Sequence, residues 1–139
     1  MSKNDSGRLE LVGDRLAYSS EHYGSWEISV PDISFIGEYT NENGPFADDW
    51  FLVFVENQER IWKEASMYSD GRQEVLAELG SRLGVKLISD LTTSTSFKSR
   101  IMWPADRVGE DLFEFVSTGW FKNRQSLRQD LHGEGPVPN

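Results

Sequence analysis

The chain has 139 residues, and its 14 Lys and Arg against 23 Asp and Glu give a formal net charge of −9 at pH 7. This charge repels phosphate backbones and anionic lipid head groups, so it argues against binding to nucleic acid and to membrane surfaces. The chain has no cysteine, which excludes disulfides, thiolate metal sites and cysteine nucleophiles. No stretch approaches the ~20 apolar residues of a membrane span, and we expect a cytoplasmic protein without membrane insertion.

Length and composition predict a single β-rich domain over residues 8–132. Residues 1–7 are polar, and residues 133–139 are rich in Gly and Pro, so we expect both ends to be disordered. Between residues 8 and 67, short apolar and aromatic runs alternate with turn residues, as in an antiparallel meander. The predicted strands are 9–12, 15–19, 25–30, 33–40, 50–55 and 60–67.

Two local patterns in this meander carry specific predictions. Gly13 and Asp14 form a two-residue hairpin candidate between the first two strands. The run 50–55 is apolar on both faces, which predicts a central strand that is buried on both sides or covered by a helix.

The clearest helix is predicted over residues 71–83. Asp70 is a candidate N-cap with Gln73 three residues later, and Gly84 is placed to end the helix. Gly80 costs about 1 kcal/mol relative to Ala inside a helix, so packing of the apolar face must stabilise it. That face consists of Val75, Leu76, Leu79 and Leu83.

The part of the chain that follows this helix is less regular. Residues 97–103 are predicted to form a strand that Pro104 ends, and residues 112–116 fit strand and helix periods equally well. Residues 120–131 are predicted to form a second helix, with Trp120, Leu127 and Leu131 on one side.

Residues 9–84, a meander closed by one amphipathic helix, resemble the pleckstrin-homology-like fold of small bacterial proteins. The resemblance is carried by 13–18, 25–33 and 74–79. This chain has one strand fewer than that fold usually has, and a long segment follows the helix. The lipid-binding members use basic residues in the first hairpin loop, where this chain has Arg15 beside Asp14, so we do not expect phosphoinositide binding. The resemblance implies a scaffold for protein contacts.

We therefore predict an α+β fold: an antiparallel sheet or partly open β-barrel of the pleckstrin-homology-like type, capped by one amphipathic helix. In this prediction residues 8–84 form the core, and residues 85–132 form a C-terminal extension that contains the second helix.

Catalytic signals are absent from the sequence. The two histidines, His22 and His132, fall in a turn and near the C-terminal tail, and neither is well placed as a general base. No Gly-x-Ser-x-Gly elbow, glycine-rich dinucleotide loop or phosphate-binding loop occurs. We therefore expect a protein that is not an enzyme and that carries no cofactor.

The loop over residues 41–49 has many oxygen ligands, but it lacks the alternating spacing and the terminal Glu of a helix-loop-helix calcium site. We interpret it as a solvated hairpin loop, and we predict no metal site there. Its candidate binding residues are Tyr39, Asn41, Asn43, Phe46, Asp48 and Asp49.

The aromatic and basic residues beyond the 71–83 helix form a second candidate surface. Exposed aromatic residues anchor protein interfaces, and a basic helix could dock on the acidic body of a second copy or pack on its own body. The candidates are Trp103, Trp120, Phe121, Lys122, Arg124 and Arg128.

These observations predict a non-catalytic binding or scaffold protein whose partner is another protein or a second copy, as in a homodimer. Two alternatives stay open. A small-ligand-binding β-barrel would show a concave pocket lined by Trp and Tyr, and an acidic inhibitor of a basic protein would show a dense carboxylate patch.

Overall fold

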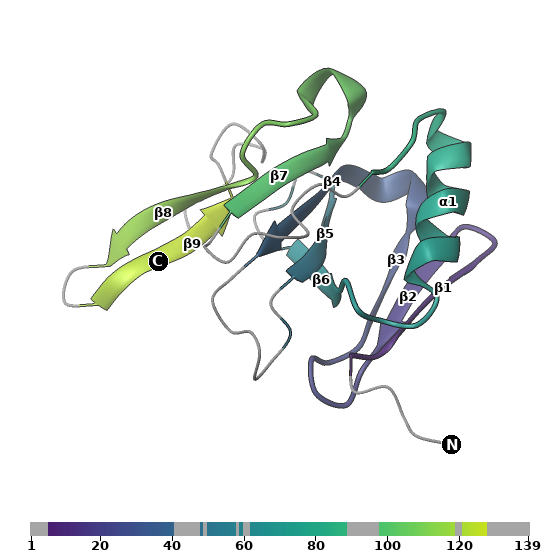
Figure 1. The fold of residues 1–139 in the computed structure, drawn as a ribbon, viewed down its shortest axis with the longest axis horizontal. Coiled ribbons are helices and arrows are strands. Elements are labelled where there is room, and N and C mark those ends of the chain that lie inside the picture. The colour runs from purple at the N-terminus through teal and green to yellow at the C-terminus, as the bar shows by residue number, and fades with distance from the viewer. Residues whose placement is uncertain are drawn as a thin grey trace.

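The computed structural model describes residues 6–40, 48, 50–57, 59, 62–88, 98–118 and 121–127, with the backbone alone for 114–118 and 121–127. The fold is α+β, with two antiparallel sheets of three and four strands, a separate two-stranded ribbon and one α-helix in the described part of the chain (Figure 1).

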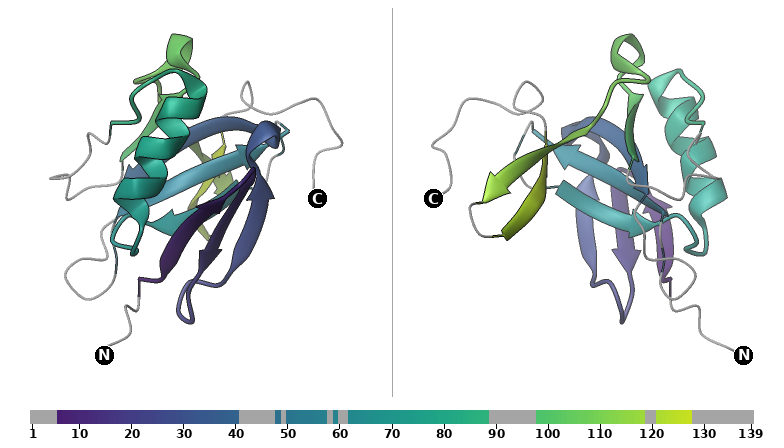
Figure 2. Two further views of the ribbon diagram at one scale, coloured as in Figure 1. Left: turned by 90° about the vertical axis from the view of Figure 1, so that its right-hand side faces the viewer. Right: turned by 60° about the vertical axis from the view of Figure 1, so that its left-hand side comes forward.

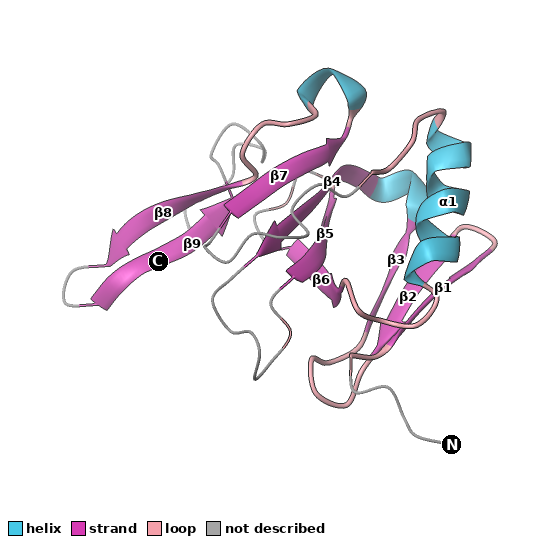
Figure 3. Ribbon diagram, in the orientation of Figure 1, coloured by secondary structure: helices cyan, strands magenta, loops and turns pink. Residues whose placement is uncertain are grey.

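The first sheet has the strand order β1-β2-β3, with β1 (Arg8–Val12), β2 (Arg15–Ser19) and β3 (Trp26–Ser29). The second sheet has the order β6-β5-β4-β7, with β4 (Ile33–Thr40), β5 (Trp50–Glu56), β6 (Trp62–Ser66) and β7 (Lys98–Trp103). Figure 3 shows these strands with α1 (Arg72–Leu83) and two short 3-10 helices, η1 (Val30–Asp32) and η2 (Ala105–Arg107). The six strands predicted before the helix are confirmed, as is the hairpin turn at Gly13 and Asp14, where Val12 pairs with Arg15.

The chain changes sheets at η1, and this corner explains why the partly open barrel is not observed. Pro31 lies in the first turn of η1, and the Val30 N–H donates to Asp14 O at 2.7 Å. Because β3 and β4 lie on either side of this corner, they belong to different sheets, and the two sheets do not close into a barrel.

An inner core lies between the two sheets, and α1 covers one side of it (Figure 2). The apolar face predicted for the helix is confirmed, because Val75, Leu76 and Leu79 are buried in this core and Leu83 packs against it. The largest fully buried side chains that the strands contribute to this inner core are Leu9, Leu16, Tyr18, Ile36, Leu52 and Phe54.

A second, outer cluster covers the opposite face of the four-stranded sheet. Leu112 and Phe113 pack there against residues of β4, β5 and β7. All six residues of the run 50–55 are buried, and the strand contributes alternately to the inner and outer clusters. The predicted central strand with two buried faces is therefore confirmed.

The helix predicted over residues 120–131 is wrong. The chain forms β9 (Phe121–Leu127), which pairs antiparallel with β8 (Phe113–Thr118), from Phe113 opposite Leu127 to Thr118 opposite Phe121. The cross-strand main-chain hydrogen bonds outweigh a helical pattern that had only three apolar positions in its favour. The resulting two-stranded ribbon projects from the body on the side away from α1 (Figures 1 and 2).

The predicted C-terminal end of the first helix is confirmed, and the predicted N-cap is wrong. Gly84 ends α1 in the left-handed conformation, and the Val85 N–H donates to Gly80 O at 2.9 Å. The N-cap, however, is Gly71 rather than Asp70, because the main chain of Asp70 is held by β1.

The ordered body begins earlier than residue 8. Ser6 and Gly7 lie in the segment for which disorder was predicted, yet both are buried. The Tyr18 hydroxyl donates to Ser6 O at 2.5 Å, and the Asp70 N–H donates to Gly7 O at 2.9 Å. Residues 1–5 and 133–139 lie outside the described residues.

Gly80 provides a test of helix packing against intrinsic propensity. A Cβ at this position would lie 2.6 Å from Val85 O. We expect Gly80→Ala to lower the free energy of unfolding by about 1–3 kcal/mol in urea denaturation, because overpacking outweighs the better helix propensity of Ala. Ser81→Ala, at an exposed neighbouring position, should change it by no more than about 0.5 kcal/mol. A Gly80→Ala variant more stable than the parent would contradict this packing.

Candidate functional site

An open groove of about 810 Å³ runs between β1 and α1. We call it the β1–α1 groove. Five consecutive residues of β1 form one side, and the start and outer edge of α1 form the other. Leu9 and Val75 are buried in the inner core, Leu11 is half-buried against it, and Val12 is 72% exposed. The lining residues are Arg8, Leu9, Glu10, Leu11, Val12, Asp70, Gly71, Glu74, Val75 and Glu78.

The β1 side of the groove is the edge of the three-stranded sheet. Among the described strands β1 pairs with β2 alone, so alternate N–H and C=O groups on its other side point away from the sheet. The Leu9 N–H points outward and donates to Asp70 O at 2.8 Å. Leu11, two residues later, points the same way, and its main chain has no backbone partner on that side among the described residues.

Gly71 allows the helix to start against this edge. Its φ is +81°, and a Cβ there would lie 2.3 Å from Leu9 O, closer than real Cβ contacts come. A glycine is therefore required for α1 to begin beside β1.

Carboxylates line the helix side of the groove at regular spacing. Asp70, Glu74 and Glu78 are exposed and follow one another four residues apart, which brings them to one edge of α1 and its first turn. Like charges at this spacing cost a few tenths of a kcal/mol per pair, so the stripe does not stabilise the helix. Glu74 makes no ion pair with any described basic side chain.

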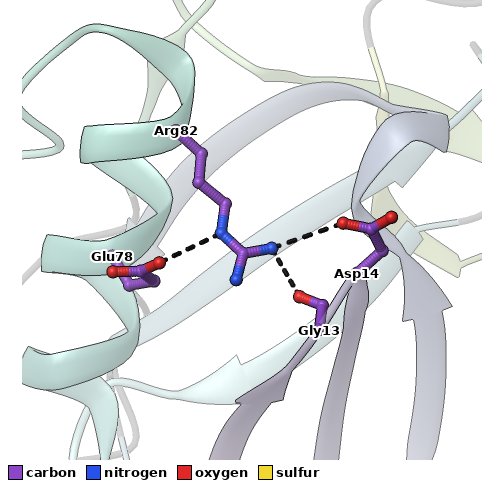
Figure 4. Close-up of polar contacts among 4 residues, drawn as sticks. All are labelled: Gly13, Asp14, Glu78 and Arg82. Carbon is purple, nitrogen blue, oxygen red and sulfur yellow. Dashed lines mark hydrogen bonds and ion pairs between the residues drawn. The ribbon is translucent and has the colours of Figure 1, made fainter.

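Arg82 follows Glu78 at the same spacing and bridges α1 to the β1–β2 turn (Figure 4). Its guanidinium donates to Gly13 O in the β1–β2 turn, and it lies 3.5 Å from Asp14 and 3.2 Å from Glu78. Arg82 thus ties the last turn of α1 to the first hairpin, and Asp70 ties the first turn to the start of β1. The groove lies between these two attachments.

A second groove, of about 560 Å³, lies on the other side of α1, against the segment 85–88. It is mainly apolar, and Ile88 at its end is 60% exposed.

The predicted interaction residues do not come together in either groove. Trp103 is half-buried and packs against the inner core. Phe121, Lys122 and Arg124 lie on β9, where the backbone alone is described, and Trp120 and Arg128 lie outside the described residues.

The predicted loop residues are only partly described. Tyr39 is buried, and its hydroxyl donates to Glu64 Oε2 at 2.5 Å. Asp48 accepts from Ser66 Oγ at 2.5 Å, and its N–H donates to the Tyr23 hydroxyl at 3.1 Å. Both residues thus support the fold, while Asn41, Asn43, Phe46 and Asp49 lie outside the described residues.

One carboxylate is fully buried in the four-stranded sheet. Glu38 accepts from Trp50 Nε1 at 2.8 Å and from the Arg100 guanidinium at 2.9 Å, and Arg100 also donates to Ile88 O. Neither groove includes Glu38, so this cluster joins β4, β5 and β7 internally. Within the described ranges, no group of three or more His, Asp or Glu residues is arranged to hold a metal ion.

The sequence analysis missed the residues of the β1–α1 groove. The available signals were the spacing of Asp70, Glu74 and Glu78, and an apolar Val12 directly before a turn. No protein-family model, curated protein or solved structure matches this chain. No helix in the described part is long and apolar enough to cross a membrane.

Buried tyrosines predict a loss of stability at alkaline pH. Burial, and then the charge of Glu64, raise the pKa of Tyr39 well above its ordinary value, and burial also raises the pKa of Tyr18 and Tyr23. The folded state therefore holds these protons more tightly than the unfolded chain, whose tyrosines have a pKa of about 10. Their contribution to stability is full below about pH 10 and is lost as the pH rises above it.

We expect the melting temperature to fall steeply above about pH 10. Tyr39→Phe should be less stable at neutral pH, because Glu64 loses a hydrogen bond, but its decline above pH 10 should be shallower. Thermal melts of both proteins between neutral and strongly alkaline pH check this. Equal slopes would show that Tyr39 does not contribute to the decline.

Proposed function

We propose that this chain is a non-catalytic protein-binding module and that the β1–α1 groove is its binding surface. The observation that carries the proposal is the outward-facing main chain of Leu11, which has no backbone partner among the described residues and lies on an edge strand beside the exposed Val12. Unpaired edges are a common route by which proteins recognise extended segments. The resemblance to the pleckstrin-homology-like fold and the cytoplasmic location remain predictions.

The two alternatives differ in how well the geometry supports them. A small-ligand barrel has little support, because the two sheets do not close and large side chains fill the space between them. An inhibitor of a basic protein is a special case of the proposed module, because the groove carries a stripe of carboxylates.

Self-association is a second candidate, favoured by the β8–β9 ribbon. The ribbon forms its own two-stranded sheet and projects from the body (Figure 1). Two-stranded ribbons are at best marginally stable in water, so a second copy that packs on this one would stabilise it. Light scattering on the intact chain should then give twice the monomer mass of 15.9 kDa. A monomer mass at every concentration would remove this candidate.

The groove proposal is tested with a displayed library of random peptides selected on the intact, immobilised chain. Val12→Asp places a charge on an exposed groove residue. We expect it to weaken the binding of the selected peptides about tenfold or more, because burying the aspartate against an apolar side chain of the peptide removes its hydration. Val108→Asp is the matched control, because Val108 is also exposed, at 46%, and does not line the groove. Affinity is measured by calorimetry for both variants and the parent.

Peptides that bind all three proteins equally would place the binding surface elsewhere. If no peptide binds the chain at all, the proposed module is wrong.

A further inference from the structure

We infer that the occupant of the β1–α1 groove is an extended, Lys- or Arg-containing segment of a partner protein that pairs with the main chain of Leu11. This inference rests on the proposed function and names the chemistry of the partner. Its first support is that Asp70 of this chain already forms main-chain hydrogen bonds with the first half of the β1 edge.

Asp70 occupies the first half of the β1 edge as a one-residue added strand. It runs parallel to β1, donates to Gly7 O at 2.9 Å and accepts from the Leu9 N–H at 2.8 Å. The chain then turns away into α1 at Gly71. The outward-facing main chain of Leu11 therefore continues a row of hydrogen bonds that Asp70 begins. A ligand residue beside Leu11 would extend this row.

The attachments at both ends limit the length of the segment. The free edge extends from Leu9, which is bonded to Asp70, to Gly13, whose carbonyl is bonded to Arg82. Because a strand rises about 3.3 Å per residue, about three to four ligand residues fit between them. The groove volume of about 810 Å³ lies within the range of ligand-binding pockets in proteins.

Charge decides the kind of side chain that such a segment carries. Four carboxylates, Glu10, Asp70, Glu74 and Glu78, line the groove, against Arg8 within it and Arg82 at its end. Arg8 lies 2.6 Å from Glu10, and Arg82 lies 3.2 Å from Glu78, whereas Glu74 has no ion pair among the described side chains. The whole chain carries −9. An acidic segment would be repelled, and a basic one attracted.

The apolar residues of β1 predict that basic and apolar side chains alternate along the bound segment. Leu11 and Val12 follow each other on β1, one half-buried and the other exposed, and the exposed carboxylates of α1 lie across the groove. Because side chains on an extended segment alternate in direction, a segment with basic and apolar residues in turn presents each kind to its own surface.

The test uses a capped tetrapeptide of alternating Lys and Val, short enough for the free part of the edge, titrated into the intact, isotope-labelled chain up to millimolar concentration. The comparison peptides are the Glu–Val counterpart and a Lys–Val peptide with alternate amides N-methylated. Amide hydrogen exchange of Leu11 is followed by NMR. We expect Lys–Val binding to slow this exchange about tenfold or more, because a new hydrogen bond protects the amide. The Glu–Val and N-methylated peptides should bind at least about tenfold more weakly.

Two matched variants separate the local charge from the net charge. Glu74→Lys should weaken Lys–Val binding about tenfold and reduce its salt dependence. Asp106→Lys makes the same change in net charge at an exposed residue of η2, which does not line the groove, and should weaken binding less than about twofold.

The inference is overturned if Lys–Val does not bind, if Glu–Val binds equally well, or if the Leu11 amide exchanges at an unchanged rate in the complex. The proposed function is wrong if Val12→Asp lowers the affinity of none of the library peptides, and this result is independent of the Lys–Val experiment. Library peptides that need Val12 but are acidic, or that bind as helices, would keep the module and reject this partner.

Discussion

The placement of α1 depends on the main chain of Asp70. Its two hydrogen bonds to Gly7 and Leu9 hold the start of the helix against β1, and Gly71 provides the left-handed turn that such a close approach requires. Without this attachment, the start of α1 would be held over the inner core only by the packing of Val75, Leu76 and Leu79, and the far end by Arg82. Loss of this packing would expose the open side of two sheets that do not form a barrel to water.

Much of the fold could be predicted from local patterns. The alternation of apolar residues located six strands, the doubly apolar run located β5, and Gly84 located the end of α1. The prediction was wrong for β9, because Trp120, Leu127 and Leu131 fit a helical period, whereas the hydrogen bonds between β9 and β8 leave little trace in the sequence of β9. It was also wrong for the N-cap, because the tertiary contact with β1 occupies the main chain of Asp70 that a capping pattern would use.

The groove was harder to predict than the fold. The strand order determines which strand lies at an edge. The amino-acid sequence of residues 8–12 does not show that β2 is the only described strand that pairs with β1. The spacing of Asp70, Glu74 and Glu78 was visible, but an acidic helix face is common in a protein of net charge −9. Only the neighbouring edge and the exposed Val12 separate this stripe from an ordinary solvated surface. Tyr39 and Asp48 were predicted as surface candidates because Tyr39 precedes the polar loop 41–49 and Asp48 lies within it, whereas their hydrogen bonds support the interior.

The carboxylate stripe also has a consequence for the chain's behaviour at high concentration. A bare strand edge is a template for uncontrolled sheet growth between identical molecules, and natural proteins protect such edges with charge. Here every neighbouring copy brings the same stripe and the same net charge, so edge-to-edge stacking of this chain is opposed by Coulomb repulsion. The feature that admits a foreign basic strand is thus also a guard against aggregation. This protection weakens in concentrated salt, which screens the charges of the carboxylates.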